Sequence, residues 1–246
     1  MNYWRHFASN QSNCSDWRCG DHCGALMVAA PASAADLSPL GSLSLAGAPL
    51  PAELEAKAIA KMNELGVDAS KQAGLLAKLA AGVPLDSEAV PAVAPVAVSE
   101  YRIGVTDYIR EVFPDGSVSL GALEHPVVPT TGGNPSARSI SGCTYSLSAG
   151  VATNSNCKIS HSSISYDFYF RASYYQAAGG AKITSVNPTD WQLNATIDDC
   201  SMQSLGKTSE TSARLTGKCV FMGMGSRSQW VNLSISKTSA TETANF

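Results

Sequence analysis

The chain has 246 residues, 44% hydrophobic and 15% charged, and its 17 Lys and Arg against 20 Asp and Glu leave a net charge of −3. This composition excludes a disordered chain, and no apolar run reaches the roughly 18 residues that a membrane-spanning helix needs. The lack of a basic excess also argues against a nucleic acid partner.

The N-terminus, residues 1–34, has features of a secretory signal. Ala25 to Ala30 is apolar, and Ala32-Ser33-Ala34 has the small-x-small pattern that signal peptidase accepts. The apolar run is short and follows a polar segment, so two interpretations of the first 24 residues compete: a mistranslated start of a true signal, or a genuine Cys/His segment. That segment lacks the paired C-x2-C elements of zinc sites, and we predict no metal or cofactor.

Cleavage after this signal-like segment would also account for the odd number of cysteines. The chain has seven, and three of them precede residue 24. The even set that remains suits two disulfide bonds in an oxidising compartment, so the sequence predicts a secreted protein. The four remaining cysteines are Cys143, Cys157, Cys200 and Cys219.

Residues 35–50 are predicted to form a linker and residues 51–83 a helical hairpin. Apolar side chains recur at helical spacing from Ala52 to Leu65, and Asp68 or Ser70 is suited to cap a second helix. Gly82 and Pro84 then end the helical pattern of apolar residues.

Residues 84–135 are predicted to be a linker plus a β-hairpin. The Pro-rich stretch 89–98 favours an extended spacer. One strand is expected from Tyr101 to Phe113, followed by the turn dipeptide Asp115-Gly116 and a second strand at 117–120.

Residues 136–246 alternate between apolar and polar side chains and are rich in Ser and Thr. The clearest alternation runs from Ile164 to Tyr175, and similar patterns follow at 191–197, 213–221 and 231–235. Because no segment of helical period interrupts them, we predict an antiparallel β-sandwich, which makes the fold class mainly β.

The alternation also predicts where the cysteines point. Cys143, Cys157 and Cys219 share the parity of apolar neighbours and should face the core. Four cysteines allow three pairings. We favour Cys143–Cys157 and Cys200–Cys219, because each of these pairs would link neighbouring strands of a meander.

The run LGVDASKQAGLLAKLAAGVPLDS, followed by FPDGS and a Cys-containing β-rich region, resembles a group of uncharacterised exported proteins of Gram-positive bacteria. The resemblance implies export and supplies no activity. It is carried by Leu65, Gly66, Leu76, Lys78, Leu79, Gly82, Asp86, Ser87, Asp115 and Gly116.

The sequence identifies no catalytic residue. After signal cleavage only His125 and His161 remain as histidines, and Gly223-Met224-Gly225-Ser226 is not the G-x-S-x-G turn of a serine hydrolase. Asp198 and Asp199 are adjacent, so on a strand they would point to opposite faces and could not act together on a glycosidic bond.

A binding surface is the better-supported prediction. On the side of the 164–175 strand opposite the core, Asp167, Tyr169, Arg171 and Tyr175 combine rings with hydrogen-bonding groups, as glycan and peptide sites do, and Trp230 would add an exposed ring. The structural alternative is that the tyrosines stabilise the sheet as cross-strand pairs and that Trp230 covers an edge.

Charge is unevenly distributed along the chain. Residues 36–135 have 6 basic and 12 acidic residues and a net charge of −6, while residues 136–246 have 9 basic and 6 acidic residues and a net charge of +3. Opposite signs favour docking of the helical region on the sandwich. Charged faces exposed to solvent explain the distribution equally well.

We therefore expect a secreted, non-catalytic protein that binds a glycan or a protein at the cell surface. The alternatives are a secreted hydrolase with an N-terminal pro-region, and a secreted inhibitor or toxin-like protein.

Overall fold

The computed structural model describes residues 49–126, 142–197, 199–220 and 225–246, which all belong to one unit. The predicted signal-like segment 1–34 lies outside the described residues, and so do most of the predicted linker 35–50 and residues 127–135.

Two helices open the described part of the chain, as the apolar spacing predicts. They are α1 (Ala52–Glu64) and α2 (Ala69–Ala80), and a 3-10 turn, η1 (Asp86–Glu88), follows. The Asp68 carboxylate accepts a hydrogen bond of 2.8 Å from Ser70 N, so Asp68 is the N-cap of α2.

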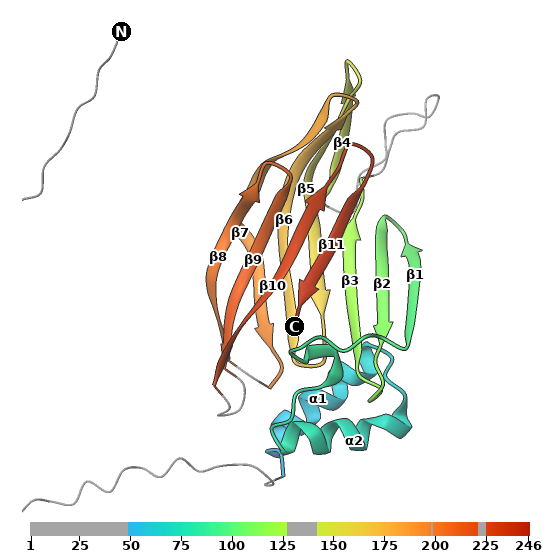
Figure 1. Cartoon of the computed structure of the whole chain (residues 1–246), viewed down its shortest axis with the longest axis vertical. Helices are drawn as coiled ribbons and strands as arrows, with labels where there is room; N and C mark the ends of the chain where they lie inside the picture. The colour runs from blue at the N-terminus through green and yellow to red at the C-terminus, as the bar shows by residue number, and fades with distance from the viewer. Residues whose placement is uncertain (1–48, 127–141, 198, 221–224) are drawn as a thin grey trace, which may run out of the picture. The chain divides into compact units, whose positions relative to one another are not determined.

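The rest of the described chain forms two antiparallel sheets, and the mainly β fold class is confirmed (Figure 1). Sheet A has the order β1-β2-β3-β5-β6-β7, with β4 also paired to β5, and sheet B has the order β11-β10-β9-β8. Sheet A consists of β1 (Ala97–Ile103), β2 (Thr106–Val112), β3 (Val118–Glu124), β4 (Thr144–Ser148), β5 (Val151–Ser162), β6 (Tyr166–Ala177) and β7 (Gly180–Ala195). Sheet B consists of β8 (Asp199–Ser209), β9 (Ser212–Val220), β10 (Ser226–Ile235) and β11 (Ala240–Asn245).

The strands of residues 84–126 form a three-stranded meander rather than one hairpin, and they begin only at Ala97. The single strand expected from Tyr101 to Phe113 is broken by a turn in which Gly104 has a φ of 61°, and Ile103 pairs with Thr106 across it. β3 then pairs with β5, so sheet A continues across residue 136, where we expected the sandwich to begin.

Every second side chain of β6 points into the core between the sheets. Tyr166, Phe168, Phe170 and Tyr174 are buried and pack with side chains such as Leu215 of sheet B. Burying a large apolar side chain contributes roughly 1.5–3 kcal/mol, so this stripe supplies much of the driving force for sheet packing.

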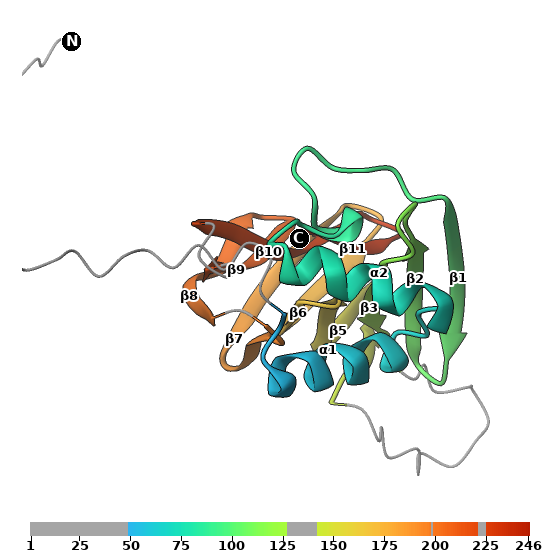
Figure 2. The same cartoon turned by 90° about the horizontal axis from the view of Figure 1, so that it is seen from below.

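The helices lie across one end of the two sheets (Figure 2). Met62, Leu75 and Leu79 form a second apolar cluster with Ile164 and Ile197 of the β region. The helical region thus packs against the sheets, as the opposite net charges predict, but the contact is largely apolar. The ion pair between the two parts, from the buried Lys61 to the half-buried Asp167 at 2.7 Å, has the reverse arrangement of signs.

Both predicted disulfides are confirmed. Cys143 bonds to Cys157 of β5, and Cys200 bonds to Cys219 across the β8–β9 pair. Their sequence separations of 14 and 19 residues correspond to about 3 kcal/mol of stabilisation each in the chain-entropy model.

Candidate functional site

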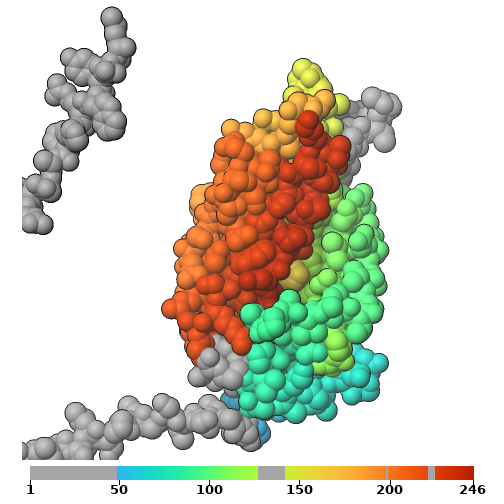
Figure 3. All heavy atoms as spheres, in the orientation of Figure 1, coloured from blue at the N-terminus to red at the C-terminus, as the bar shows by residue number. Residues whose placement is uncertain are grey.

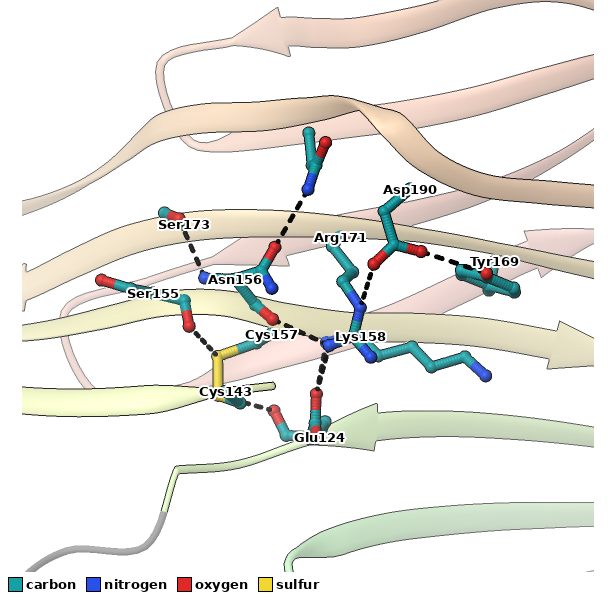
Figure 4. Close-up of polar contacts among 11 residues, drawn as sticks. Glu124, Cys143, Ser155, Asn156, Cys157, Lys158, Tyr169, Arg171, Ser173 and Asp190 are labelled. Carbon is teal, nitrogen blue, oxygen red and sulfur yellow. Dashed lines mark hydrogen bonds and ion pairs between the residues drawn. A yellow bond between two sulfur atoms is a disulfide. The ribbon is translucent and has the colours of Figure 1, made fainter. Parts of the chain in front are cut away.

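Arg171 lies at the centre of a polar cluster on the outer face of sheet A (Figure 4). Its Nη1 donates to Glu124 Oε2 and to the Asn156 carbonyl, each at 2.9 Å, and its Nε lies 2.8 Å from Asp190 Oδ2. Tyr169 donates its hydroxyl to Asp190 at 3.1 Å. We call Glu124, Lys158, Tyr169, Arg171 and Asp190 the outer-face cluster.

This cluster uses its polar groups internally. The Lys158 ammonium lies 4.2 Å from the centroid of the Tyr169 ring and covers the face on which a sugar would stack. Burial and the hydrogen bond to Asp190 raise the pKa of the Tyr169 hydroxyl above its ordinary value, which keeps it a donor at neutral pH. The arrangement ties β3, β5, β6 and β7 together.

The other residues of the predicted binding face lie apart from this cluster. Asp167 accepts from Lys61 of α1 and holds the helix, while Tyr175 lies toward the other end of β6, opposite Lys182 of β7. Trp230 belongs to β10 of the other sheet, where the Arg214 guanidinium lies 4.0 Å from its ring centroid. The structure therefore does not bring the five predicted residues together on one surface.

A groove lies where sheet A extends past sheet B. β11 is the end strand of sheet B and packs mainly against β3 and β5, and Ile109 on the inner side of β2 is 36% exposed. Figure 3 shows the hollowed line where the red surface of β10 and β11 meets the green surface of the β1–β3 meander. We call this the β11 groove.

The β11 groove consists of three cavities, of about 380, 300 and 420 Å³, that share lining residues and follow one another along β11. The first two share Ile109, Gly121 and Glu242, and the last two share Glu111, His161 and Ala244. The groove therefore continues along the strand rather than forming an isolated pocket.

A buried hydrogen-bonded pair of side chains lies in the wall of the groove. His161 Nδ1 lies 3.0 Å from Glu242 Oε1, and the two side chains are 12% and 6% exposed. A Cβ at position 121 would clash with Glu242 Oε2, so only glycine lets this carboxylate lie against β3. Among the described residues, Glu242 is the one hydrogen-bond partner of the His161 ring, and no hydroxyl is placed for activation by it.

A second charged group lies at the mouth of the groove. Asp107 Oδ2 accepts from Arg102 Nη2 at 2.7 Å and lies 2.9 Å from His125 Nε2. The hydrogen bond from Arg102 holds the pKa of the Asp107 carboxyl below its ordinary value, which keeps it ionised at neutral pH. Together with Glu100 and Glu111, the groove lining has an excess of negative charge.

The peptide groups of β11 complete the groove. Ser236 N bonds to Ser239 O in the β10–β11 turn, and the ladder therefore directs the peptide groups of Thr241 and Thr243 toward β10. Those of Ala240, Glu242 and Ala244 point to the free edge. This edge is a row of donors and acceptors beside an open floor.

The sequence patterns missed this groove because it depends on which strands each sheet contains. Two local signals pointed to it. Gly121 interrupts an otherwise regular strand, which is typical of a close approach by another group, and Glu242 occupies an inward position of β11.

Comparison with known proteins gives little information on function. No family model matches the chain, and no curated protein matches it. A solved structure of a hypothetical protein from Listeria monocytogenes EGD-e is 25% identical, covers 57% of this chain and 94% of its own, and has a TM-score of 0.34.

Two other kinds of site are absent from the part of the chain that the structure describes. The described residues contain no group of three or more His, Cys, Asp and Glu side chains that could hold a metal ion. In the same part of the chain, no helix is long and apolar enough to span a membrane.

Proposed function

We propose that this chain is an extracellular, non-catalytic binding protein that receives an extended segment of a partner protein in the β11 groove. The observation that carries the proposal is the free edge of β11 beside a cavity that the inner side of β1 and β2 lines, where Ile109 is 36% exposed. Addition of a strand to such an edge is a recurrent mode of peptide recognition, in which main-chain hydrogen bonds supply affinity.

The dimensions of a sandwich favour this occupant. A strand added to sheet B would lie about 4.8 Å from β11, and packed sheets stand about 10 Å apart. Such a strand would lie above β2, with every second side chain directed toward the inner side of β2, where Ile109 lies beside Gly121 of β3. It would place a fifth strand on sheet B where sheet A already provides the facing layer.

The charge of the lining selects the chemistry of the segment. Glu100, Asp107, Glu111 and Glu242 line the groove, and among these acids Asp107 and Glu242 already have basic partners. We therefore propose a segment with Lys or Arg at every second position, because only every second side chain of an extended strand would face the acidic floor of the groove.

Export is supported by three independent features. Two disulfides are formed, the N-terminal 1–34 segment has signal-like features, and the resemblance noted above is to exported proteins of Gram-positive bacteria. These features favour a protein or cell-surface partner outside the cytoplasm.

The test is selection of linear peptides from a displayed random library on the full chain, followed by fluorescence anisotropy of the enriched peptides. The blocking variant is Ala244→Pro, which removes a peptide N–H on the free edge and leaves the bonds to β10 in place. We expect enriched peptides to contain Lys or Arg at alternate positions and to bind this variant at least roughly ten-fold more weakly.

Tyr175→Ala is the matched control, because it alters the outer face of sheet A and leaves the groove untouched. Both variants must keep the thermal midpoint of the parent. Equal binding to Ala244→Pro together with loss of binding to Tyr175→Ala would refute the groove and favour the outer face.

A further inference from the structure

β1, the end strand of sheet A, is the most exposed edge in the described part of the chain. All seven of its residues are exposed, including Val98 at 53%, Tyr101 at 40% and Ile103 at 63%. Its pairing with β2 is regular throughout. By contrast, the edge strand β8 of sheet B carries two register irregularities, which are a common protection of edges against pairing.

The free side of β1 is complete as a template for another strand. Ile103 and Thr106 flank the two-residue turn, so Ile103 and Tyr101 bond to β2. The peptide groups of Val98, Glu100 and Arg102 therefore point outward. A regular edge with open donors and acceptors and apolar side chains on its surface favours strand-to-strand association.

We infer that β1 pairs antiparallel with β1 of a second copy of this chain, about a two-fold axis at Tyr101. In this register Glu100 lies opposite Arg102 of the other copy, and the reverse pair forms by symmetry. The two Tyr101 rings become neighbours. Each already stacks on Tyr108 of its own chain at 5.3 Å, so four rings would form one row.

Charge selects this register over its neighbours. A two-fold axis at Glu100 would place two carboxylates opposite each other, and an axis at Arg102 would oppose two guanidinium groups, both of which destabilise a strand pair. Only the axis at Tyr101 gives two opposite-charge pairs. Arg102 can serve this pair while retaining Asp107, because guanidinium has five donors.

We propose a second copy rather than another protein as the partner of β1, because the strand is self-complementary. In one register Glu100 of each copy lies opposite Arg102 of the other. The contact is small, about five residues from each chain, so it belongs to the weak class of interfaces. We expect a monomer–dimer equilibrium visible between roughly 10 μM and 1 mM.

The decisive experiment is sedimentation equilibrium of two single variants, Glu100→Arg and Arg102→Glu, alone and mixed. Each variant alone opposes like charges across the axis, so dimerisation should weaken at least about ten-fold relative to the parent chain. Mixing them places two positive side chains opposite two negative ones. The mixture should associate at least as strongly as the parent.

Crosslinking fixes the register independently. Tyr101→Cys places two thiols directly opposite each other, whereas in Ser99→Cys the equivalent positions are four residues out of register, beyond the roughly 7 Å that a disulfide allows. Under mild oxidation Tyr101→Cys should give a dimer linked through residue 101, identified by peptide mass, above the background of the unsubstituted chain. A monomeric parent, a mixture that fails to associate, or equal crosslinking of Ser99→Cys would overturn the inference.

Discussion

Glu124 provides the sharpest test of the structural role of the outer-face cluster. Its carboxylate is 8% exposed and accepts two hydrogen bonds of 2.9 Å, one from Lys158 N and one from Arg171 Nη1. Glu124→Gln keeps the shape and an acceptor for Lys158 N but removes the charge opposite a guanidinium that is 17% exposed.

Removing one member of a buried pair costs about 3–5 kcal/mol, and since Arg171 retains Asp190 and the Asn156 carbonyl we expect the lower end, about 3 kcal/mol. With a urea m-value of about 2 kcal/mol/M, the midpoint of unfolding should fall by roughly 1.5 M. Arg171→Met combined with Glu124→Gln should cost less than the sum of the single changes, because neither charge is left unpaired.

The matched control is Glu53→Gln, which removes an exposed carboxylate from its ion pair with Lys57 and should leave the urea midpoint unchanged. A loss below about 1 kcal/mol for Glu124→Gln, or strict additivity in the double variant, would refute a structural role for the cluster.

Three further predictions concern stability. Burial raises the pKa of Tyr174 to about 12, so between pH 10 and 12 the unfolded chain loses a proton that the folded chain keeps. The free energy of unfolding should therefore fall by about 3 kcal/mol over this range. In Tyr174→Phe the urea midpoint should depend less on pH over the same range. The pKa of Asp115 lies below 3.8, because the opposing effect of burial is outweighed by hydrogen bonds from Ser117 and Lys78. The stability that this carboxylate contributes should be retained above pH 3.8 and lost as the pH falls further. Asp115→Asn should remove this acid dependence in the same assay. Replacing Cys143 and Cys157 together by Ala should cost about 2–5 kcal/mol by calorimetry, and an unchanged melting temperature would contradict the bond's contribution.

Local patterns predicted the elements that depend on local physics. The helical hairpin follows from apolar spacing and the Asp68 cap, and both disulfides follow from strand parity together with proximity in sequence. The β1–β2 turn was missed because Gly104-Val105 lacks the Asn-Gly or Asp-Gly signal and the alternation runs on through it.

The binding surface depended on non-local pairing and could not be read in the same way. Parity correctly indicates that Tyr169 and Trp230 face away from the core, but it does not say that they belong to different sheets. Likewise, the β11 groove exists because β3 pairs with β5 and thereby carries β1 and β2 past the end of sheet B.

Residue-resolved amide hydrogen exchange of the chain with a peptide selected on it tests the proposed groove most directly. In the free chain the amides of Thr241 and Thr243 bond to β10, while those of Glu242 and Ala244 face the free edge. Strand addition predicts that the peptide slows exchange at Glu242 and Ala244 and hardly changes it at the other two. Protection confined to the outer face around Tyr169 and Tyr175, with Glu242 and Ala244 unchanged, would contradict the account.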